Sequence, residues 1–133
     1  QQTQKWASRP VASQQQTLTK IVRKATLTEF GKDHKFADIH GHDEFREAVP
    51  IRDYEGLKPY VEMILQGQED ILWPGKPAYF AKTSGTTSGV KYIPVTSDSV
   101  PNHINSARNA LLSYVHETGK SEFLDKKLIF LLN

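Results

Sequence analysis

Apolar residues recur three or four positions apart in three stretches, the spacing of one face of an α-helix. The stretches are Leu18–Ala25, Leu57–Leu65 and Ile104–Val115. The first predicts a helix over Thr17–Phe30, with Gly31 as its C-cap. The second predicts a helix that begins near Lys58, because Pro59 is best tolerated in a first turn, and that ends at Gly67.

The third stretch predicts the longest helix. Asp98 or Ser99 is expected to cap it, Pro101 lies in its first turn, and Gly119 closes it. A shorter helix is expected over Glu44–Ala48, with Asp43 as its N-cap and Pro50 beyond its end.

Three other runs have the apolar and β-branched character of strands, namely Ala78–Lys82, Lys91–Thr96 and Lys127–Leu132. The first two are expected to pair as an antiparallel hairpin, because the loop between them is too short for a parallel crossover. The third is wholly apolar from Leu128 to Leu132, which is typical of a strand buried on both faces. A turn is predicted at Pro74-Gly75.

A doubly buried strand needs neighbours, so the chain is expected to be the N-terminal portion of a larger α/β protein. The expected division has three parts. They are a polar arm at 1–16, a mainly helical region at 17–76 and a β-loop-β-helix-β region at 77–133.

Composition narrows the class of protein. The 133 residues carry 17 basic and 15 acidic side chains, a balance that does not favour a nucleic-acid binder. There is no cysteine, which excludes disulfides and thiolate–metal sites, and the chain has no apolar run long enough to span a membrane. The Gln-rich start does not resemble a secretory signal. The expectation is a soluble, cytoplasmic protein with no membrane or nucleic-acid partner.

Some polar and aromatic residues could bind a ligand, but each also has an ordinary structural interpretation. His40 and His42 have the spacing of a His-x-His metal pair, but Gly41 between them favours a turn, so no metal site is assigned. A basic helix face could bind an anion, although a solvated face is the favoured interpretation; it comprises Lys20, Arg23 and Lys24. Trp73 could stack on a base, but packing in a core or hinge is favoured.

The segment Thr83–Lys91, "TSGTTSGVK", carries the most specific chemistry. Gly85 and Gly89 allow the backbone to approach a ligand closely, and successive amides in such a loop form an anion-binding concavity. Hydroxyl donors and one lysine complete a set that suits a polyphosphate; they are Ser84, Thr86, Thr87, Ser88 and Lys91. The P-loop and dinucleotide-binding patterns both fail on their glycine spacing.

This segment resembles the Thr-Ser-Gly-Thr-Thr-Gly-x-Pro-Lys signature of the acyl-adenylating superfamily. It matches at Thr83–Thr87 and at Lys91, and departs from it at Ser88 and Val90. With its flanking sequences, "FREAVPIRDYEGLKPYVEMILQGQEDILWPGKPAYF" and "VPNHINSARNALLSYV", the chain resembles the auxin-responsive acyl-acid amido synthetases, in particular their bacterial members.

The resemblance implies the N-terminal portion of a luciferase-like adenylating fold, in which helices join part of a larger β-sheet. It also implies activation of a carboxylic acid by ATP with Mg²⁺, then amide formation with an amino acid, the rest of the enzyme completing the fold. In that family's terms, the ATP-binding residues would be Ser84, Thr86, Thr87 and Ser88, which would hold phosphate oxygens, Gly85 and Gly89, which would shape the turn, and Lys91. Lys91 would be catalytic and would offset charge as pyrophosphate leaves. The later nucleotide motifs of the family have no match here, so this chain alone is expected to be inactive.

Three other interpretations remain open from the residues. The loop could be a flexible hairpin turn, the chain could be a non-catalytic phosphate- or nucleotide-binding module, or it could be an interaction domain. The acyl acid, the amine and the oligomeric state are not indicated by the sequence.

Overall fold

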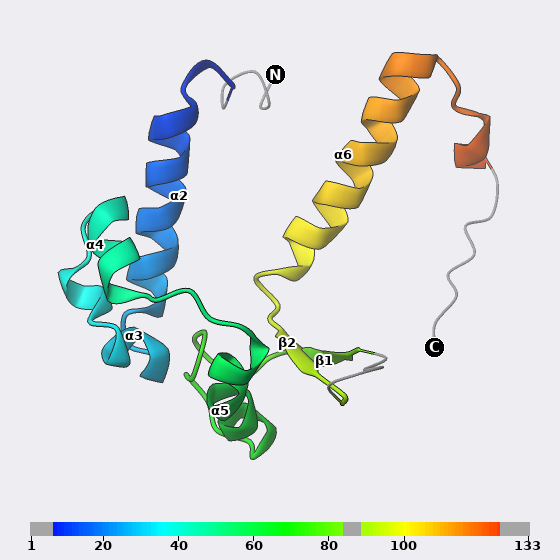
Figure 1. The fold of residues 1–133 in the computed structure, drawn as a ribbon. Helices are drawn as coiled ribbons and strands as arrows, with labels where there is room; N and C mark the ends of the chain where they lie inside the picture. The colour runs from blue at the N-terminus through cyan, green and yellow to red at the C-terminus, as the bar shows by residue number, and fades with distance from the viewer. Residues whose placement is uncertain (1–6, 84–88, 126–133) are drawn as a thin grey trace. The chain divides into compact units, whose positions relative to one another are not determined.

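A computed structural model describes residues 7–83 and 89–125. The chain forms two compact units, 1–96 and 97–133. The described elements of the first unit are α2 (Pro10–Ala25), α3 (Glu29–Asp33), the 3₁₀ turn η1 (Phe36–Asp38), α4 (His42–Ala48), α5 (Tyr54–Leu65), β1 (Tyr79–Lys82) and β2 (Tyr92–Val95). Those of the second are α6 (Val100–Thr118) and the 3₁₀ turn η2 (Glu122–Asp125) (Figure 1). Helices with a small two-stranded sheet are compatible with the predicted α/β class; the predicted strand Lys127–Leu132 lies outside the described residues.

The first helix differs from the prediction at both ends. It begins at Pro10, so part of the predicted polar arm is helical, and it ends at Ala25. Gly31 is not its C-cap but lies inside the next helix, α3, whose N-cap is Thr28. The Thr28 hydroxyl accepts a hydrogen bond from the Gly31 amide at 3.0 Å and donates one to the Ala25 carbonyl at 2.7 Å, so the side chain starts one helix while it closes the other.

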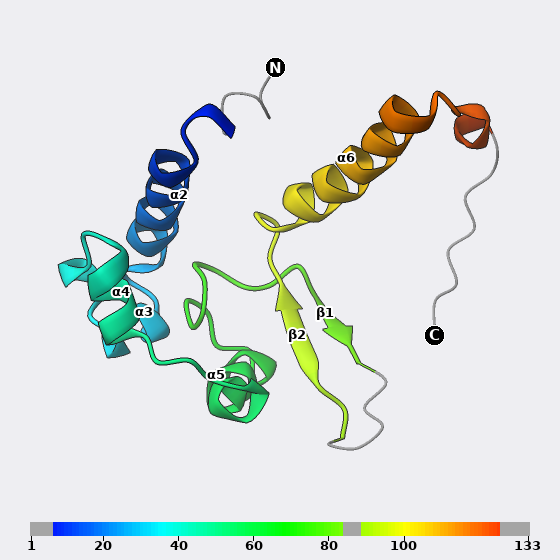
Figure 2. The ribbon, with the colours of Figure 1, turned by 45° about the horizontal axis from the view of Figure 1, so that its top comes forward.

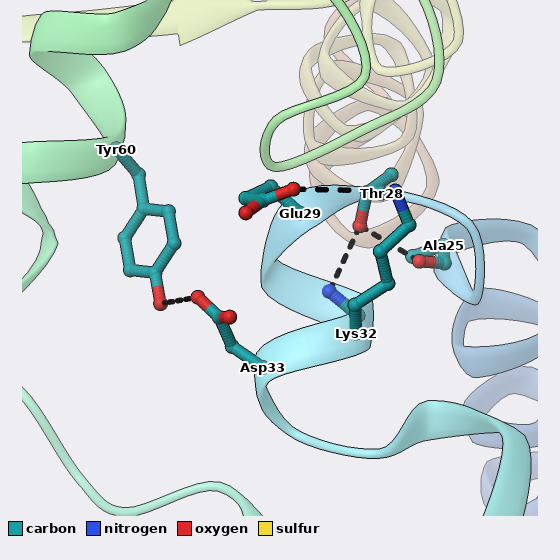
Figure 3. A network of polar contacts seen from close by, with 7 residues as sticks. Ala25, Thr28, Glu29, Lys32, Asp33 and Tyr60 are labelled. Carbon is teal, nitrogen blue, oxygen red and sulfur yellow. Dashed lines mark hydrogen bonds and ion pairs between the residues drawn. The ribbon is translucent and has the colours of Figure 1, made fainter.

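Close packing, not conformation, explains Gly31. A Cβ atom there would overlap the carbonyl oxygen of Ala25 and lie 3.0 Å from the carbonyl oxygen of Thr26. Only glycine therefore lets α3 lie directly against the end of α2. Figure 3 shows this junction, with the buried Thr28 between Ala25 and the first turn of α3.

The core of the first unit forms around α2. Val22, Ala25 and Phe36 are its buried centre. Partly buried apolar residues surround it, namely Leu18, Phe30, Ile39, Phe45, Val49 and Trp73. Trp73 thus packs against the core, and the ammonium of Lys24 lies 5.5 Å from its ring centroid. The turn at Pro74-Gly75 is confirmed: Gly75 has φ +76°, and its amide donates to the Asp70 carboxylate at 2.7 Å.

The short helix α4 begins at His42 rather than at Glu44, and its N-cap is Gly41, not Asp43. Asp43 lies in the first turn, where its negative charge interacts favourably with the positive end of the helix dipole. The neighbouring Glu44 carboxylate accepts a hydrogen bond from the His40 amide at 3.2 Å.

Helix α5 also begins earlier than predicted. Its N-cap is Asp53, whose carboxylate accepts from the Gly56 amide at 3.0 Å, so Pro59 lies inside the helix and not in its first turn. The predicted end is confirmed. Gly67 has φ +90°, its amide donates to the Ile64 carbonyl, and the next amide, from Gln68, donates to the Met63 carbonyl, which is a Schellman motif.

Polar contacts join α3 to the region of α5. The Tyr60 hydroxyl donates to the Asp33 carboxylate at 2.6 Å (Figure 3). The buried His34 donates from Nδ1 to the Phe30 carbonyl, because a carbonyl can only accept, and its Nε2 accepts from the Arg52 guanidinium at 2.8 Å. These contacts and the edge-on packing of Phe30 against Tyr60 hold α5 beside α3.

This contact has a testable pH dependence. Partial burial, and then the hydrogen bond to Asp33, raise the pKa of Tyr60 above its ordinary value of about 10. Because the folded state favours the neutral phenol, this contribution to stability is present below about pH 10 and is lost as pH rises through the raised folded-state pKa. Tyr60→Phe should therefore lose less stability than the wild type between about pH 9 and pH 11, as measured by thermal midpoints.

The control for that experiment is Tyr79→Phe, which removes the hydroxyl of an exposed tyrosine on β1. An alkaline loss of stability that is equal in the wild type and in Tyr60→Phe would contradict the assignment.

The two strands form an antiparallel hairpin, as predicted (Figure 2). In its register Lys82 lies opposite Tyr92, and Phe80 lies opposite Pro94. The Thr83 amide donates to the Lys91 carbonyl at 3.0 Å, so Thr83 and Lys91 form a hydrogen-bonded pair. Since such pairs alternate along an antiparallel ladder, the backbone groups of Tyr92 and Pro94 face away from β1. Pro94 therefore removes no hydrogen bond between the strands, because its nitrogen lies on the outer edge of β2.

The second unit is described by itself. Helix α6 has Ser99 at its N-cap position and Pro101 in its first turn, and it ends at Gly119, which has φ +69°, as predicted. The Tyr114 ring packs edge-on against Phe123 of η2. None of the helices in the described ranges has the length and apolar character that crossing a membrane requires.

Candidate functional site

The candidate site is the loop that joins β1 to β2. Residues Ser84, Gly85, Thr86, Thr87 and Ser88 lie outside the described residues, so the structure describes the two ends of the loop. These ends meet at Thr83 and Lys91 through the pairing of the Thr83 amide with the Lys91 carbonyl. The Lys91 amide in turn donates to the Thr83 hydroxyl at 3.3 Å. The hairpin therefore brings the first residue of the motif against its lysine.

Gly89 has φ +80°, the left-handed region that L side chains rarely adopt. No described residue lies within 4 Å of a Cβ atom built there. The positive φ, and not a described neighbour, therefore accounts for glycine at this position.

Lys91 is held by an aromatic ring. Its ammonium nitrogen lies 5.2 Å from the ring centroid of Tyr54, which is within cation–π range. The Tyr54 hydroxyl accepts a hydrogen bond from the Tyr92 amide at 3.0 Å and donates to the Tyr92 carbonyl at 3.4 Å, the longer and weaker contact. Tyr54 thus joins α5 to the residue that follows Lys91.

A small cavity lies beside this contact, between α5 and the start of β2. It has a volume of about 180 Å³ and is lined by Tyr54, Glu55, Lys58, Val61, Glu62, Leu65, Val90 and Tyr92. Pockets that enclose a small ligand commonly measure about 300–1,000 Å³. This cavity is therefore too small to hold a nucleotide.

The structure does not gather the histidines into a site. His40 is exposed, and His42 lies beside the Asp43 carboxylate at 3.4 Å, on the surface. Within 7–83 and 89–125, no three histidine, aspartate or glutamate side chains are grouped as metal ligands.

The structure adds two contacts of the candidate site that the sequence does not indicate. Thr83 belongs to the motif, but its pairing with Lys91 at the base of the loop emerges only in the structure. Tyr54 was missed because the helix was expected to begin near Lys58. The signal was present: Asp53 is a good N-cap, and Tyr54 continues the helical spacing of Leu57, Val61 and Ile64 by one more turn.

These features define a class of protein: a mixed α/β chain in which a β-hairpin carries a loop of hydroxyl residues and glycines. A family profile described as "GH3 family N-terminal domain" matches residues 1–132. The chain therefore belongs to the GH3 family.

Curated relatives agree with this assignment. The chain is 33% identical over 103 residues to a probable indole-3-acetic acid-amido synthetase GH3.13 of Oryza sativa subsp. japonica, covering 70% of this chain and 22% of the relative. It is 31% identical over 120 residues to the indole-3-acetic acid-amido synthetase GH3.15 of Arabidopsis thaliana, covering 88% of this chain and 20% of the relative. The chain thus spans about a fifth of the length of these relatives. No solved structure was found to match it.

Proposed function

We propose that this chain supplies the first ATP phosphate-binding loop of an acyl-acid amido synthetase. The observation that carries the proposal is the pairing of Thr83 with Lys91, which closes a loop of hydroxyl residues and glycines and brings a lysine to its base. The GH3 relatives, which are named amido synthetases, support the reaction class. The proposed setting is the N-terminal portion of a luciferase-like adenylating fold in a soluble cytoplasmic enzyme.

The proposed reaction has two steps. A carboxylate oxygen attacks the α-phosphorus of ATP, the bond to the bridging oxygen breaks, and pyrophosphate leaves. The amine nitrogen of an amino acid then attacks the acyl carbon, AMP leaves, and the nitrogen loses a proton.

The loop would act in the first step, where negative charge grows on the leaving oxygens. Backbone amides and hydroxyls of Ser84–Gly89 would donate to phosphate oxygens, and the charge of Lys91 would stabilise the departing pyrophosphate. Mg²⁺ would arrive with ATP and reduce the charge of its phosphates.

The test uses the full gene product with ATP, Mg²⁺ and a panel of carboxylic acids that includes indole-3-acetic acid. Pyrophosphate release that depends on the acid, followed by amide formation with one or more amino acids detected by mass spectrometry, is the expected result. Binding of ATP without acid-dependent pyrophosphate release would support the alternative, a non-catalytic nucleotide-binding module.

Gly89 gives a prediction on the loop itself. Because Gly89 has a positive φ and no described residue crowds it, asparagine should be tolerated best, alanine less well and valine least. Gly89→Asn should keep pyrophosphate release within about threefold of wild type, whereas Gly89→Val should lose about tenfold or more. Equal rates for the asparagine and valine variants would show that the loop does not need this conformation.

A further inference from the structure

One side chain of α5 contacts the candidate site twice. The Tyr54 hydroxyl is bonded to the backbone of Tyr92, and its ring lies 5.2 Å from the ammonium nitrogen of Lys91. Both contacts are within the first unit, and both fall at the point where the loop returns to the sheet. Tyr54 therefore holds both the backbone next to Lys91 and the ammonium group of the Lys91 side chain.

The choice of an aromatic partner matters for the chemistry. Lysine is a point charge on a flexible four-carbon stem, so an unsupported ammonium samples many positions. A carboxylate would hold it but would also neutralise it. A ring face attracts the cation without cancelling its charge, so the ammonium stays available to an anion. Among the described residues Lys91 forms no ion pair, and the nearby Glu55 carboxylate is engaged by Lys58 at 3.6 Å.

We infer that Tyr54 is the positioning residue for Lys91. Its hydroxyl sets the start of β2, and its ring holds the ammonium, still charged, at the base of the phosphate-binding loop before ATP arrives. This inference rests on the proposed function, since it assigns to Tyr54 an effect that acts only through Lys91.

The experiment is a double-mutant cycle in the full gene product. Single variants are Tyr54→Phe, Tyr54→Leu and Lys91→Ala, and each tyrosine variant is also combined with Lys91→Ala. Two quantities are measured: the rate of acid-dependent pyrophosphate release, and the affinity for free pyrophosphate by calorimetry. The control is Tyr60→Phe. It removes a tyrosine hydroxyl from the same helix, but this hydroxyl donates to Asp33 and not to the candidate site.

Tyr54→Leu should lower the rate and the pyrophosphate affinity by about 3- to 30-fold. In the Lys91→Ala background the same substitution should change either quantity by less than about twofold, because the residue it positions is gone. Tyr54→Phe keeps the ring and should fall between Tyr54→Leu and wild type, and Tyr60→Phe should match wild type. The phenylalanine variant keeps the test usable if Tyr54→Leu fails to fold.

The outcomes separate the inference from the proposed function. Equal losses with and without Lys91 would mean that Tyr54 has a purely structural role, and the inference would be wrong while the proposed function stood. Tyr54→Leu within about twofold of wild type would also overturn it. If Lys91→Ala alone left both quantities unchanged, the proposed role of the loop lysine would fail, and the inference with it.

Discussion

Replacing Lys91 with alanine is expected to slow acid-dependent pyrophosphate release by about 30- to 1,000-fold, corresponding to about 2 to 4 kcal/mol of transition-state stabilisation. The reason is that the lysine charge would meet the departing pyrophosphate, where negative charge grows as the bond to phosphorus breaks. AMP lacks that group, so the affinity for AMP should change much less than the rate. Pre-steady-state release of pyrophosphate and equilibrium binding of AMP measure the two effects separately.

Lys82→Ala is the matched control. Lys82 lies opposite Tyr92 in the register, next to the Thr83–Lys91 pair. Because successive side chains point to opposite faces of a hairpin, the two lysines lie on different faces, and the control removes the same charge from the wrong side. A rate for the Lys91→Ala enzyme within about threefold of wild type, less than about 0.7 kcal/mol, would rule out the proposed role.

Replacing Gly31 with alanine is expected to destabilise the first unit by about 3 kcal/mol. In an ordinary helix this change stabilises by about 1 kcal/mol, because glycine has the greater conformational entropy to lose. Here the added methyl would overlap the Ala25 carbonyl, and backbone atoms cannot move aside as a flexible side chain can. Urea unfolding of the two proteins would measure the difference.

Gly56→Ala serves as the control, since Gly56 is also a helical glycine. Its added Cβ would lie 3.2 Å from the Cβ atom of Arg52, a tight contact that a shift of a few tenths of an ångström relieves, whereas the Cβ at Gly31 would overlap a backbone carbonyl. This variant should stay within about 1 kcal/mol of wild type. A Gly31→Ala protein as stable as the Gly56→Ala protein would show that α3 can separate from the end of α2 at little cost.

The sequence predicted the elements whose signals are local. The hairpin follows from two β-type runs and a short loop, and the ends of α5 and α6 follow from Gly67 and Gly119, both in the left-handed region. Gly31 is also a glycine, but the structure requires it for a different reason. Its need arises from contact with the end of α2, and no local pattern distinguishes a glycine required by packing from one required by a positive φ.

The contacts of the candidate site divide in a similar way. The motif singles out Lys91 from spacing within one loop, and its role stays a prediction, whereas Tyr54 is 37 positions earlier in the chain and meets Lys91 only after α5 packs against β2. Pro59 also misled the prediction, because a proline inside a helix costs a hydrogen bond and so suggested a later start. The family resemblance supplied the reaction class, and the described residues added a neighbour for its lysine.

The hairpin is chemically one-sided. Along the outer edge of β2, Pro94 has no amide hydrogen and the amide and carbonyl of Tyr92 are already bonded to Tyr54. Along β1, the alternation turns the amides and carbonyls of Phe80 and Lys82 outward, and in the described part of the chain β1 pairs with β2 alone. An additional strand can therefore pair with the outer edge of β1 but not with that of β2. The backbone groups of the hairpin alone thus determine the edge at which this sheet can be extended.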